Sequence, residues 1–306
     1  MKRLIVTADD FGVSLAVNAA IEAAYANGIL TTASLMVGGA AAADAVARAR
    51  RLPGLKVGLH ITLVCGRPVL APVDIPDLVD AHGHLQTHLF RAGLGFFFRP
   101  TVRRQLEAEI RAQFERFRAA GLRLDHVNAH NHMQLHPTVR ALILSVGREY
   151  GMPALRVPCE PPLPSWRASR EGLLRRVGVW LFLAPWLRRL VAALRRAELQ
   201  HNDFVFGMQD TGRMTEDRVL ALLAELPAGV SEMYFHPAVR KAPENGWPGS
   251  YRCDEELQAL TSPTVAAALR ASGIHRTSFS DLAAPGASRN GDAISGDARA
   301  RGKRHG

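Results

Sequence analysis

Apolar and polar positions follow two patterns along this chain of 306 residues. Short runs rich in Val, Ile and Leu have the length of buried strands, and longer stretches repeat apolar residues every three or four positions, as helices do. The expected strands lie at 3–6, 32–37, 56–61, 124–129, 154–157, 231–235 and 275–278. The expected helices lie at 15–27, 40–51, 101–120, 137–150, 172–199 (with a break near Pro185), 216–226 and 263–272.

The regular alternation of strands and helices predicts a parallel sheet, either doubly wound or closed into a barrel. No glycine-rich nucleotide fingerprint follows the first strand. Polar residues recur near the ends of separate strands, at Asp9, Asp10, His60, His130, Arg156 and His236. A barrel gathers such ends around one mouth. We therefore expect an α/β fold over residues 1–284, a single (β/α) barrel-like domain with seven strands and imperfect closure, followed by a disordered basic tail at 285–306.

The net charge of +10 is confined to two places. Residues 166–196 carry eight arginines and one acid, and 285–306 carry a further excess of +3, which leaves the remaining chain neutral. Nucleic-acid-binding proteins spread basic residues over a docking face, so no nucleic-acid partner is expected. The three cysteines have neither disulfide nor metal-site spacing. A strand is expected at residues 3–6, where a signal peptide would otherwise lie. We therefore expect a cytoplasmic protein. Its oligomeric state stays open, a dimer included.

Two adjacent carboxylates, Asp9 and Asp10, follow the first expected strand. Adjacent carboxylates repel one another unless a metal ion or an arginine shares them. A turn that caps the next helix would explain one of the two, but not both beside a buried strand. The pair is therefore a candidate functional site.

A histidine-rich segment follows the strand at 124–129. Its histidines are His126, His130, His132 and His136. His130 and His132 would point in opposite directions in an extended chain, so only one of them should share a site with Asp10 and His60. Two imidazoles and one carboxylate form a common site for a divalent metal, with open positions for water and substrate. The second carboxylate can then act as a base.

The residues alone also allow purely structural roles for these histidines. The histidine-rich segment could be a polar loop, and His60 could be a hydrogen-bonded core residue. His236 lies before Pro237 at the end of another strand, where it could donate a proton to a leaving group or could serve only the structure.

Taken together, these segments resemble the YdjC-like carbohydrate deacetylases, the family that includes the chitooligosaccharide deacetylase ChbG and the hopanoid-biosynthesis protein HpnK. The resemblance runs from residue 2 to about residue 282. The matching segments are 7–12, 58–60, 126–137, 155–160, 235–237 and 251–257. The apolar stretches 90–98 and 166–199 make the chain most similar to the HpnK branch.

The resemblance implies a metal centre. Asp10, His60 and His130 match the metal ligands of the family. The implied cofactor is one divalent ion, commonly magnesium, although two histidine ligands also suit zinc or manganese.

The resemblance also implies catalytic residues. Asp9 matches the general base and His236 the general acid, while Arg156 lies where such enzymes often hold the base by an ion pair. His132 and Glu160 are expected near the substrate.

The implied reaction is hydrolysis of an N-acetyl group from an N-acetylglucosamine-type sugar, and the HpnK likeness implies that the sugar is carried by a hopanoid lipid. Three alternatives remain: a deacetylase of soluble chitooligosaccharides, a metal-dependent phosphoesterase on a similar barrel, and a non-catalytic sugar or lipid binder. A phosphoesterase would want ligands for two metals. A binder would not need the base Asp9.

The most apolar run, 177–187, is framed by arginine pairs at 175–176, 188–189 and 195–196. It is too short to span a bilayer. Two tryptophans inside an arginine-framed apolar run fit a segment lying in a membrane interface, so we expect peripheral contact with the inner face of a membrane through 175–196. The alternative is a helix buried against the barrel.

Overall fold

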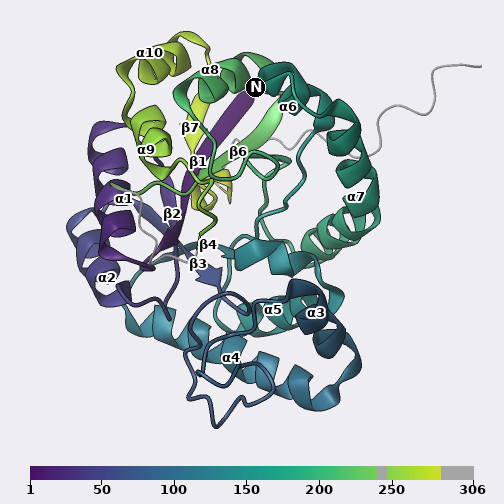
Figure 1. Cartoon of the computed structure of the whole chain (residues 1–306). Coiled ribbons are helices and arrows are strands. Elements are labelled where there is room, and N and C mark those ends of the chain that lie inside the picture. The colour runs from purple at the N-terminus through teal and green to yellow at the C-terminus, as the bar shows by residue number, and fades with distance from the viewer. Residues whose placement is uncertain (240–246, 284–306) are drawn as a thin grey trace, which may run out of the picture.

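Seven parallel strands form one curved sheet in the computed structural model, which describes residues 1–239 and 247–283 (Figure 1). The strands are β1 (Lys2–Phe11), β2 (Thr32–Leu35), β3 (Lys56–Ile61), β4 (Leu124–Ala129), β5 (Phe204–Phe206), β6 (Gly229–Phe235) and β7 (His275–Thr277). Their order is β4-β3-β2-β1-β6-β5, and β7 pairs with β1. β1 is therefore the central strand.

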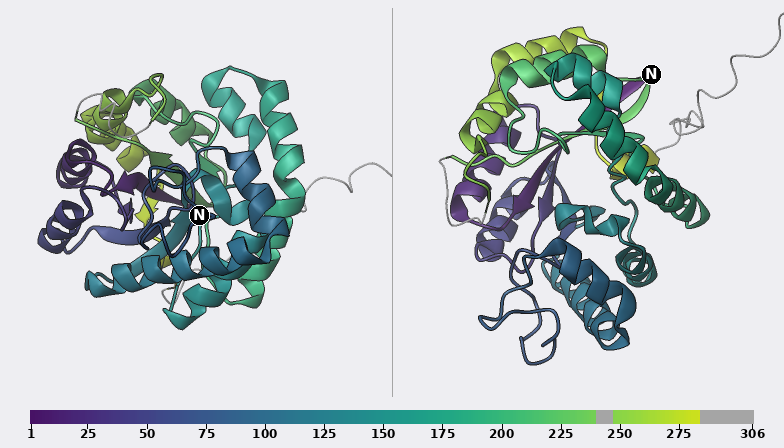
Figure 2. Two further views of the ribbon diagram at one scale, coloured as in Figure 1. Left: turned by 60° about the horizontal axis from the view of Figure 1, so that its bottom comes forward. Right: turned by 45° about the vertical axis from the view of Figure 1, so that its right-hand side comes forward.

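Helices cover the outer, convex side of the sheet (Figures 1 and 2). They are α1 (Leu15–Asn27), α2 (Ala42–Arg51), α3 (Leu89–Phe98), α4 (Pro100–Ala119), α5 (Pro137–Glu149), α6 (Pro162–Ser169), α7 (Leu173–Arg196), α8 (Glu216–Glu225), α9 (Cys253–Thr261) and α10 (Pro263–Ala271). Two short 3₁₀ helices, η1 (His130–Leu135) and η3 (Ser280–Ala283), complete the set. Strands β1 to β6 are almost wholly buried, as expected for a parallel sheet under helices, whereas the short strand β7 is exposed.

The gap between β4 and β5 is crossed by isolated bridges. Leu155 pairs with Val127 of β4, and Ala154 pairs with Gln200 on the way to β5. The sheet is thus a half-barrel whose open side is narrowed by single residues, which confirms the expected imperfectly closed barrel. The strand expected at 154–157 is present only as these two bridges.

Several local expectations were wrong or incomplete. No helix or strand was expected between residues 61 and 101, but residues 89–98 form α3, whose apolar pattern is interrupted by Gly93 and Gly95. The expected break at Pro185 does not occur, because α7 continues through this exposed residue. Helices α6 and α9 and the three-residue strand β5 were not expected either. The tail at 285–306 lies outside the described residues.

Gly58 of β3 provides a test of the packing. A Cβ atom at this position would lie 2.4 Å from ring atoms of the buried His126. We expect Gly58→Ala to lower the free energy of unfolding by about 1–3 kcal/mol, measured by urea titration. Gly178→Ala is the matched control, because a Cβ there meets open space on helix α7 and should raise stability by about 0.5–1 kcal/mol. Equal midpoints for the two variants would contradict this packing.

Candidate active site

The last residues of β1 carry the two adjacent carboxylates. The pairing register of β1 with β2 shifts between Ala8 and Phe11, and Asp10 has a left-handed backbone with φ of 62°. This irregularity lets Asp9 and Asp10 engage different partners. Helix α1 fixes the following turn, because the side-chain oxygen Oδ1 of Asn18 accepts the backbone N–H of Gly12 at 2.8 Å.

Asp10, His60 and His130 come together as a compact ligand group. Asp10 Oδ1 lies 3.2 Å from His60 Nε2 and 3.3 Å from His130 Nδ1, and the two histidine nitrogens are 3.3 Å apart. All three come from the carboxyl ends of different strands, β1, β3 and β4. Three nearly equidistant donor atoms in this arrangement can hold one metal ion.

The chemistry of these atoms fits a bound cation. Asp10 Oδ1 is buried and accepts no well-formed hydrogen bond, although it faces two imidazole nitrogens. Burial alone would raise the pKa of Asp10, but His130 and His60 hold it well below its usual range. Burial likewise opposes charge on His60, yet Asp9 and Asp10 raise its pKa. The site therefore attracts positive charge at the centre of the group, which is where a metal would lie.

Neighbouring side chains orient the ligands. Trp247 Nε1 donates to Asp10 Oδ2 at 2.7 Å, which leaves Oδ1 for the ion. Asn128 Oδ1 lies 2.7 Å from His60 Nδ1, while its amide nitrogen donates to Asp9 Oδ1 at 3.1 Å. A carboxylate only accepts, so the Asn128 amide has its nitrogen toward Asp9 and its oxygen toward His60. His60 thus donates from Nδ1 and presents the lone pair of Nε2 to the site.

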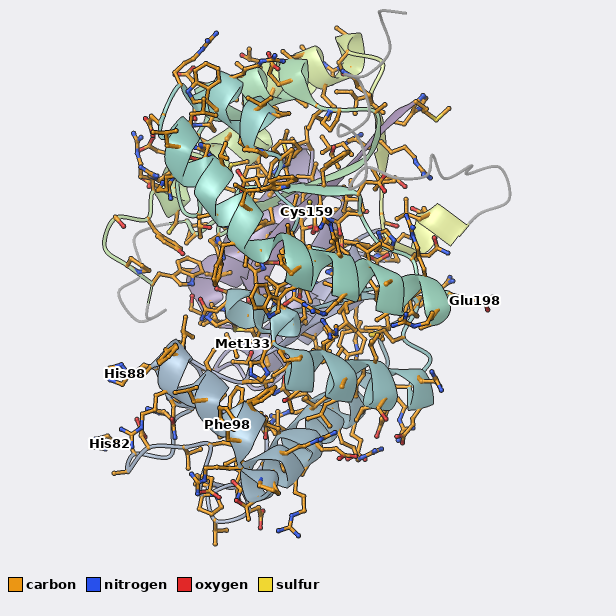
Figure 3. All side chains as sticks on the ribbon, turned by 90° about the vertical axis from the view of Figure 1, so that its right-hand side faces the viewer. His82, His88, Phe98, Met133, Cys159 and Glu198 are labelled. Carbon is orange, nitrogen blue, oxygen red and sulfur yellow. The ribbon has the colours of Figure 1, made fainter. Side chains whose placement is uncertain are left out.

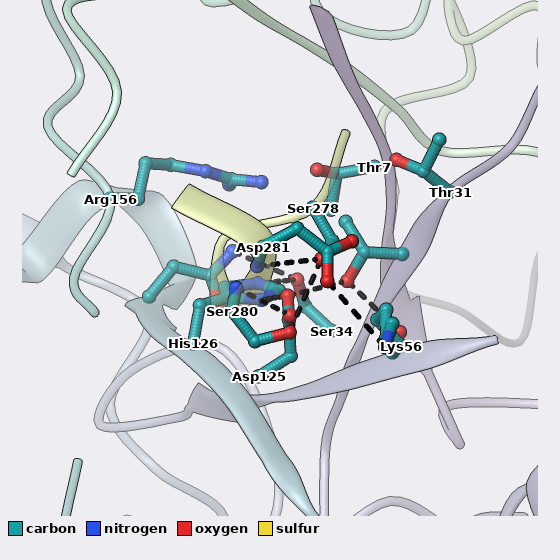
Figure 4. A network of polar contacts seen from close by, with 12 residues as sticks. Thr7, Thr31, Ser34, Lys56, Asp125, His126, Arg156, Ser278, Ser280 and Asp281 are labelled. Carbon is teal, nitrogen blue, oxygen red and sulfur yellow. Dashed lines mark hydrogen bonds and ion pairs between the residues drawn. The ribbon is translucent and has the colours of Figure 1, made fainter. Parts of the chain in front are cut away.

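Behind Asn128, a hydrogen-bond chain runs through the core (Figure 4). Asn128 donates to Ser34 Oγ at 3.0 Å, Ser34 Oγ lies 3.0 Å from His126 Nε2, and His126 Nδ1 lies 2.9 Å from Asp125 Oδ2. Asp125 also accepts the Ser280 N–H of η3 at 2.9 Å. The chain ends on the Asp125 carboxylate, which only accepts hydrogen bonds. When His126 is neutral, each N–H or O–H group along the chain therefore donates in the direction away from the metal group. This order keeps His60 in the tautomer that carries its proton on Nδ1.

Asp9 is held by a fully buried arginine. Arg156 donates to Asp9 Oδ2 at 2.5 Å and to Oδ1 at 3.0 Å, and on its other side it binds Glu232 of β6 at 2.7 and 2.9 Å. Burial raises the pKa of Asp9, but Arg156 outweighs it and keeps that pKa far below the usual range. The expected ion pair between Asp9 and Arg156 is present, and Asp9 is ionised.

A cavity of about 410 Å³ opens beside these groups. Its lining includes Asp9, His60, His130, His132, Tyr234, His236, Trp247 and Tyr251. The volume is in the range of small-molecule sites, and the mixture of aromatic and polar walls is typical of sugar-sized ligands.

His132 is not a member of the metal group, but it lines the same cavity as His130. The segment is not extended: Asn131 and His132 both have positive φ, 54° and 55°, inside η1. His132 Nε2 lies 3.2 Å from the Tyr234 hydroxyl. Burial and the nearby Arg156 charge lower the pKa of His132 to about 3, so this ring is neutral.

His236 follows β6 and is fixed through its backbone. Glu256 of α9 accepts the N–H of His236 and, at 2.9 Å, the N–H of Met214. The Nδ1 atom of His236 is buried and has no partner among the described residues. Burial lowers the pKa of His236, with Asp10 and Asp9 opposing, so the ring is neutral at rest.

Glu160 lies outside the cavity lining, and its carboxylate is engaged by the protein itself. It accepts from Ser165 at 2.7 Å and from the Gln209 N–H at 2.9 Å, and it pairs with the buried Arg176 of α7 at 3.3 Å. These contacts hold the loop at Gln209 and Asp210 against α7. Direct contact of Glu160 with substrate stays a prediction.

Several residues of the site were not among the predicted site residues. Trp247, Asn128, Tyr234, Glu232 and Glu256 act through contacts that only the fold creates. The alternation along strands could have indicated Asn128, which lies two residues from both His126 and His130.

A family model for YdjC-like proteins matches residues 3–271. The chain belongs to the YdjC-like family. It is 32% identical over 284 residues to a carbohydrate deacetylase of Brevibacillus brevis, covering 92% of this chain and 99% of that protein. It is 30% identical over 296 residues to a chitooligosaccharide deacetylase of Serratia marcescens, with 92% and 99% covered.

The solved structures agree with this fold. A putative cellobiose-phosphate cleavage protein from Enterococcus faecalis superimposes with a TM-score of 0.68 at 24% identity, covering 92% of this chain and 98% of that one. The YdjC-like fold is therefore shared over the whole barrel. The relatives do not resolve the HpnK branch from the rest of the family.

The hydrogen bond from Trp247 to Asp10 generates one test. We expect Trp247→Phe to weaken metal binding by about 10–100-fold, because Asp10 loses the donor that orients it. The measurement is calorimetric titration with Mn²⁺ and with Zn²⁺. Trp186→Phe, on helix α7, is the control with the same change of side chain and should bind metal like the parent. Unchanged affinity in both variants would contradict the assigned role.

Glu256 predicts a pH dependence of stability. Burial raises the pKa of Glu256 to about 7, and the two backbone N–H groups only partly offset it. Between pH 4.5 and 7 the folded state holds a proton that the unfolded state has lost, so the free energy of unfolding falls as pH rises, by about 3 kcal/mol. Glu256→Gln should remove this slope, whereas Glu255→Gln on the same helix should retain it. Parallel curves for both variants would show that Glu256 does not titrate in this range.

Proposed function

We propose that this protein is a metal-dependent carbohydrate deacetylase, a hydrolase that removes the N-acetyl group of an N-acetylglucosamine-type sugar. One observation carries the proposal: an ionised carboxylate, Asp9, lies beside a metal-binding group at the wall of a sugar-sized cavity. A binder would need the metal group but not the second, arginine-held carboxylate. The names of the relatives support the same activity.

A divalent metal held by Asp10, His60 and His130 would supply a Lewis acid that polarises the amide carbonyl. Asp9 accepts the proton of the attacking water, and Arg156 keeps Asp9 ionised and in place. His236 donates a proton to the leaving amine from the same cavity. Because the His236 ring is neutral at rest, it must be protonated before the C–N bond breaks. The proton that Asp9 takes from the attacking water supplies it, so that acetate and the protonated amine balance the step. The products are acetate and a free amino sugar.

The finer substrate we propose is a glycosylated hopanoid lipid. The support is the HpnK-like apolar segments and their position: Leu89, the first residue of the apolar helix α3, lines the catalytic cavity. The family resemblance favours magnesium as the ion, while two imidazoles also suit zinc and manganese.

The decisive assay is acetate release from an N-acetylglucosaminyl lipid and from N,N′-diacetylchitobiose, with each metal and with chelator. Chelator-sensitive release from the lipid alone supports the hopanoid substrate. Release from the soluble sugar retains the deacetylase and replaces the substrate with chitooligosaccharides. If neither substrate releases acetate while metal is bound, the proposed activity is wrong.

Asp9→Asn tests the base directly. We expect acetate release to fall by about 10²–10⁴-fold while metal affinity stays within a few-fold of the parent. Asp80→Asn, an exposed carboxylate in the loop before α3, should retain full activity. Full activity in the Asp9 variant would assign the base elsewhere.

A further inference from the structure

Two helices expose an unusual number of large apolar side chains. On α3 these are Leu89, Phe90, Leu94, Phe97 and Phe98, and on α7 they are Leu174, Leu181 and Phe182. Phe90 is 81% exposed, Phe98 70% and Phe182 67%. Large exposed apolar side chains gathered on one side of a protein mark an interaction site more often than single, scattered ones do.

The two helices lie on the same side of the molecule (Figure 3). Helix α3 contacts α5, and α7 contacts η1, the segment that leads into α5. His136 lies between η1 and α5, and its Nε2 donates to the Gly93 carbonyl oxygen of α3 at 3.1 Å. We call the exposed residues of these two helices the α3–α7 surface.

Helix α7 is long and apolar enough, by length and composition, to cross a membrane, and 28% of its most apolar window is buried. Its contacts argue against crossing. Arg176 is fully buried and binds Asp210 at 2.9 Å, and Leu187, Leu190 and Leu194 pack into the barrel. The uncharged stretch between Arg176 and Arg188 is eleven residues, or about 16 Å, roughly half of a bilayer core. Helix α7 therefore stays on the barrel and presents its outer face.

The positive charge beside the α3–α7 surface indicates which kind of partner this surface binds. Arg188 and Arg189 are exposed just beyond the apolar half of α7. Burial and the charges of Arg189 and Arg196 lower the pKa of Arg140 on α5, as expected where cations crowd together. Apolar side chains framed by arginines are complementary to the acyl boundary and anionic head groups of a phospholipid bilayer.

We propose that the α3–α7 surface docks the enzyme onto a bilayer that contains anionic phospholipids, with α7 lying along the interface. Leu89 belongs both to this surface and to the lining of the catalytic cavity, so docking would place the cavity mouth at the head-group level. The inference goes beyond the proposed function, because docking does not depend on which bond the site cleaves.

The test is flotation of the full chain with vesicles of phosphatidylglycerol and phosphatidylcholine, and with vesicles of phosphatidylcholine alone. We expect binding to the anionic vesicles that weakens as salt is raised. Phe90→Gln combined with Phe182→Gln should weaken binding more than tenfold. Arg188→Gln combined with Arg189→Gln should weaken it by about 25-fold on anionic vesicles.

Leu15→Gln is the matched control, because Leu15 is 63% exposed on α1, across the barrel from α7, and should leave binding unchanged. Mn²⁺ affinity is measured by calorimetric titration in every variant and should not change, because none of the substituted residues belongs to the metal group. Absence of vesicle binding, or equal binding by the Phe90/Phe182 variant, overturns the docking surface and leaves the proposed function intact. A dimer in centrifugation that the same two substitutions dissociate, without vesicle binding, assigns the surface to a second copy instead. Vesicle binding without acetate release from any substrate retains docking and rejects the proposed function.

Discussion

A single buried cation, Arg156, connects the architecture to the chemistry. It lies on the segment that bridges the gap between β4 and β5, and it binds Asp9 of β1 and Glu232 of β6 at once. Arg156 donates two hydrogen bonds to each carboxylate, so the loss of either carboxylate would leave guanidinium N–H groups without acceptors in the core. The half-barrel and the ionised state of Asp9 therefore depend on the same contact.

The contact with Arg156 gives the neighbouring carboxylates Asp9 and Asp10 different roles. Asp9 forms an ion pair with the buried Arg156. Asp10 instead faces, among the described residues, the imidazoles of His60 and His130 and the indole of Trp247. The strand irregularity at Asp10 lets residues that adjoin in sequence face two different electrostatic environments. A regular strand would place one of them on the outer face, against the helices.

The sequence predicts those parts of the site that follow from strand ends. Asp10, His60 and His130 each end a recognisable apolar run, and parallel strands bring such ends together whatever the connecting loops do. The bounds expected at 56–61 and 124–129 agree with β3 and β4.

What the sequence misses depends on tertiary contacts. Trp247 reaches Asp10 from a loop across more than 200 positions, and no local pattern encodes that approach. The direction of the His132 side chain could not be predicted, because a left-handed backbone is uncommon outside glycine and asparagine, and the expectation assumed an extended chain. Helix α3 was missed because Gly93 and Gly95 interrupt its apolar pattern, and glycine inside a segment weakens the prediction of a helix.

The hydrogen-bond chain in the core could be mistaken for the catalytic group of another class of hydrolase. Asp125, His126 and Ser34 have the order and spacing of the charge relay of a serine hydrolase, yet they lie inside the barrel and each is fully or almost fully buried. Ser34 Oγ lies 3.0 Å from His126 Nε2, and both residues are fully buried, so the oxygen is not exposed to solvent. A geometric search for nucleophilic serines would select this group, while organophosphorus reagents would find no accessible atom to modify.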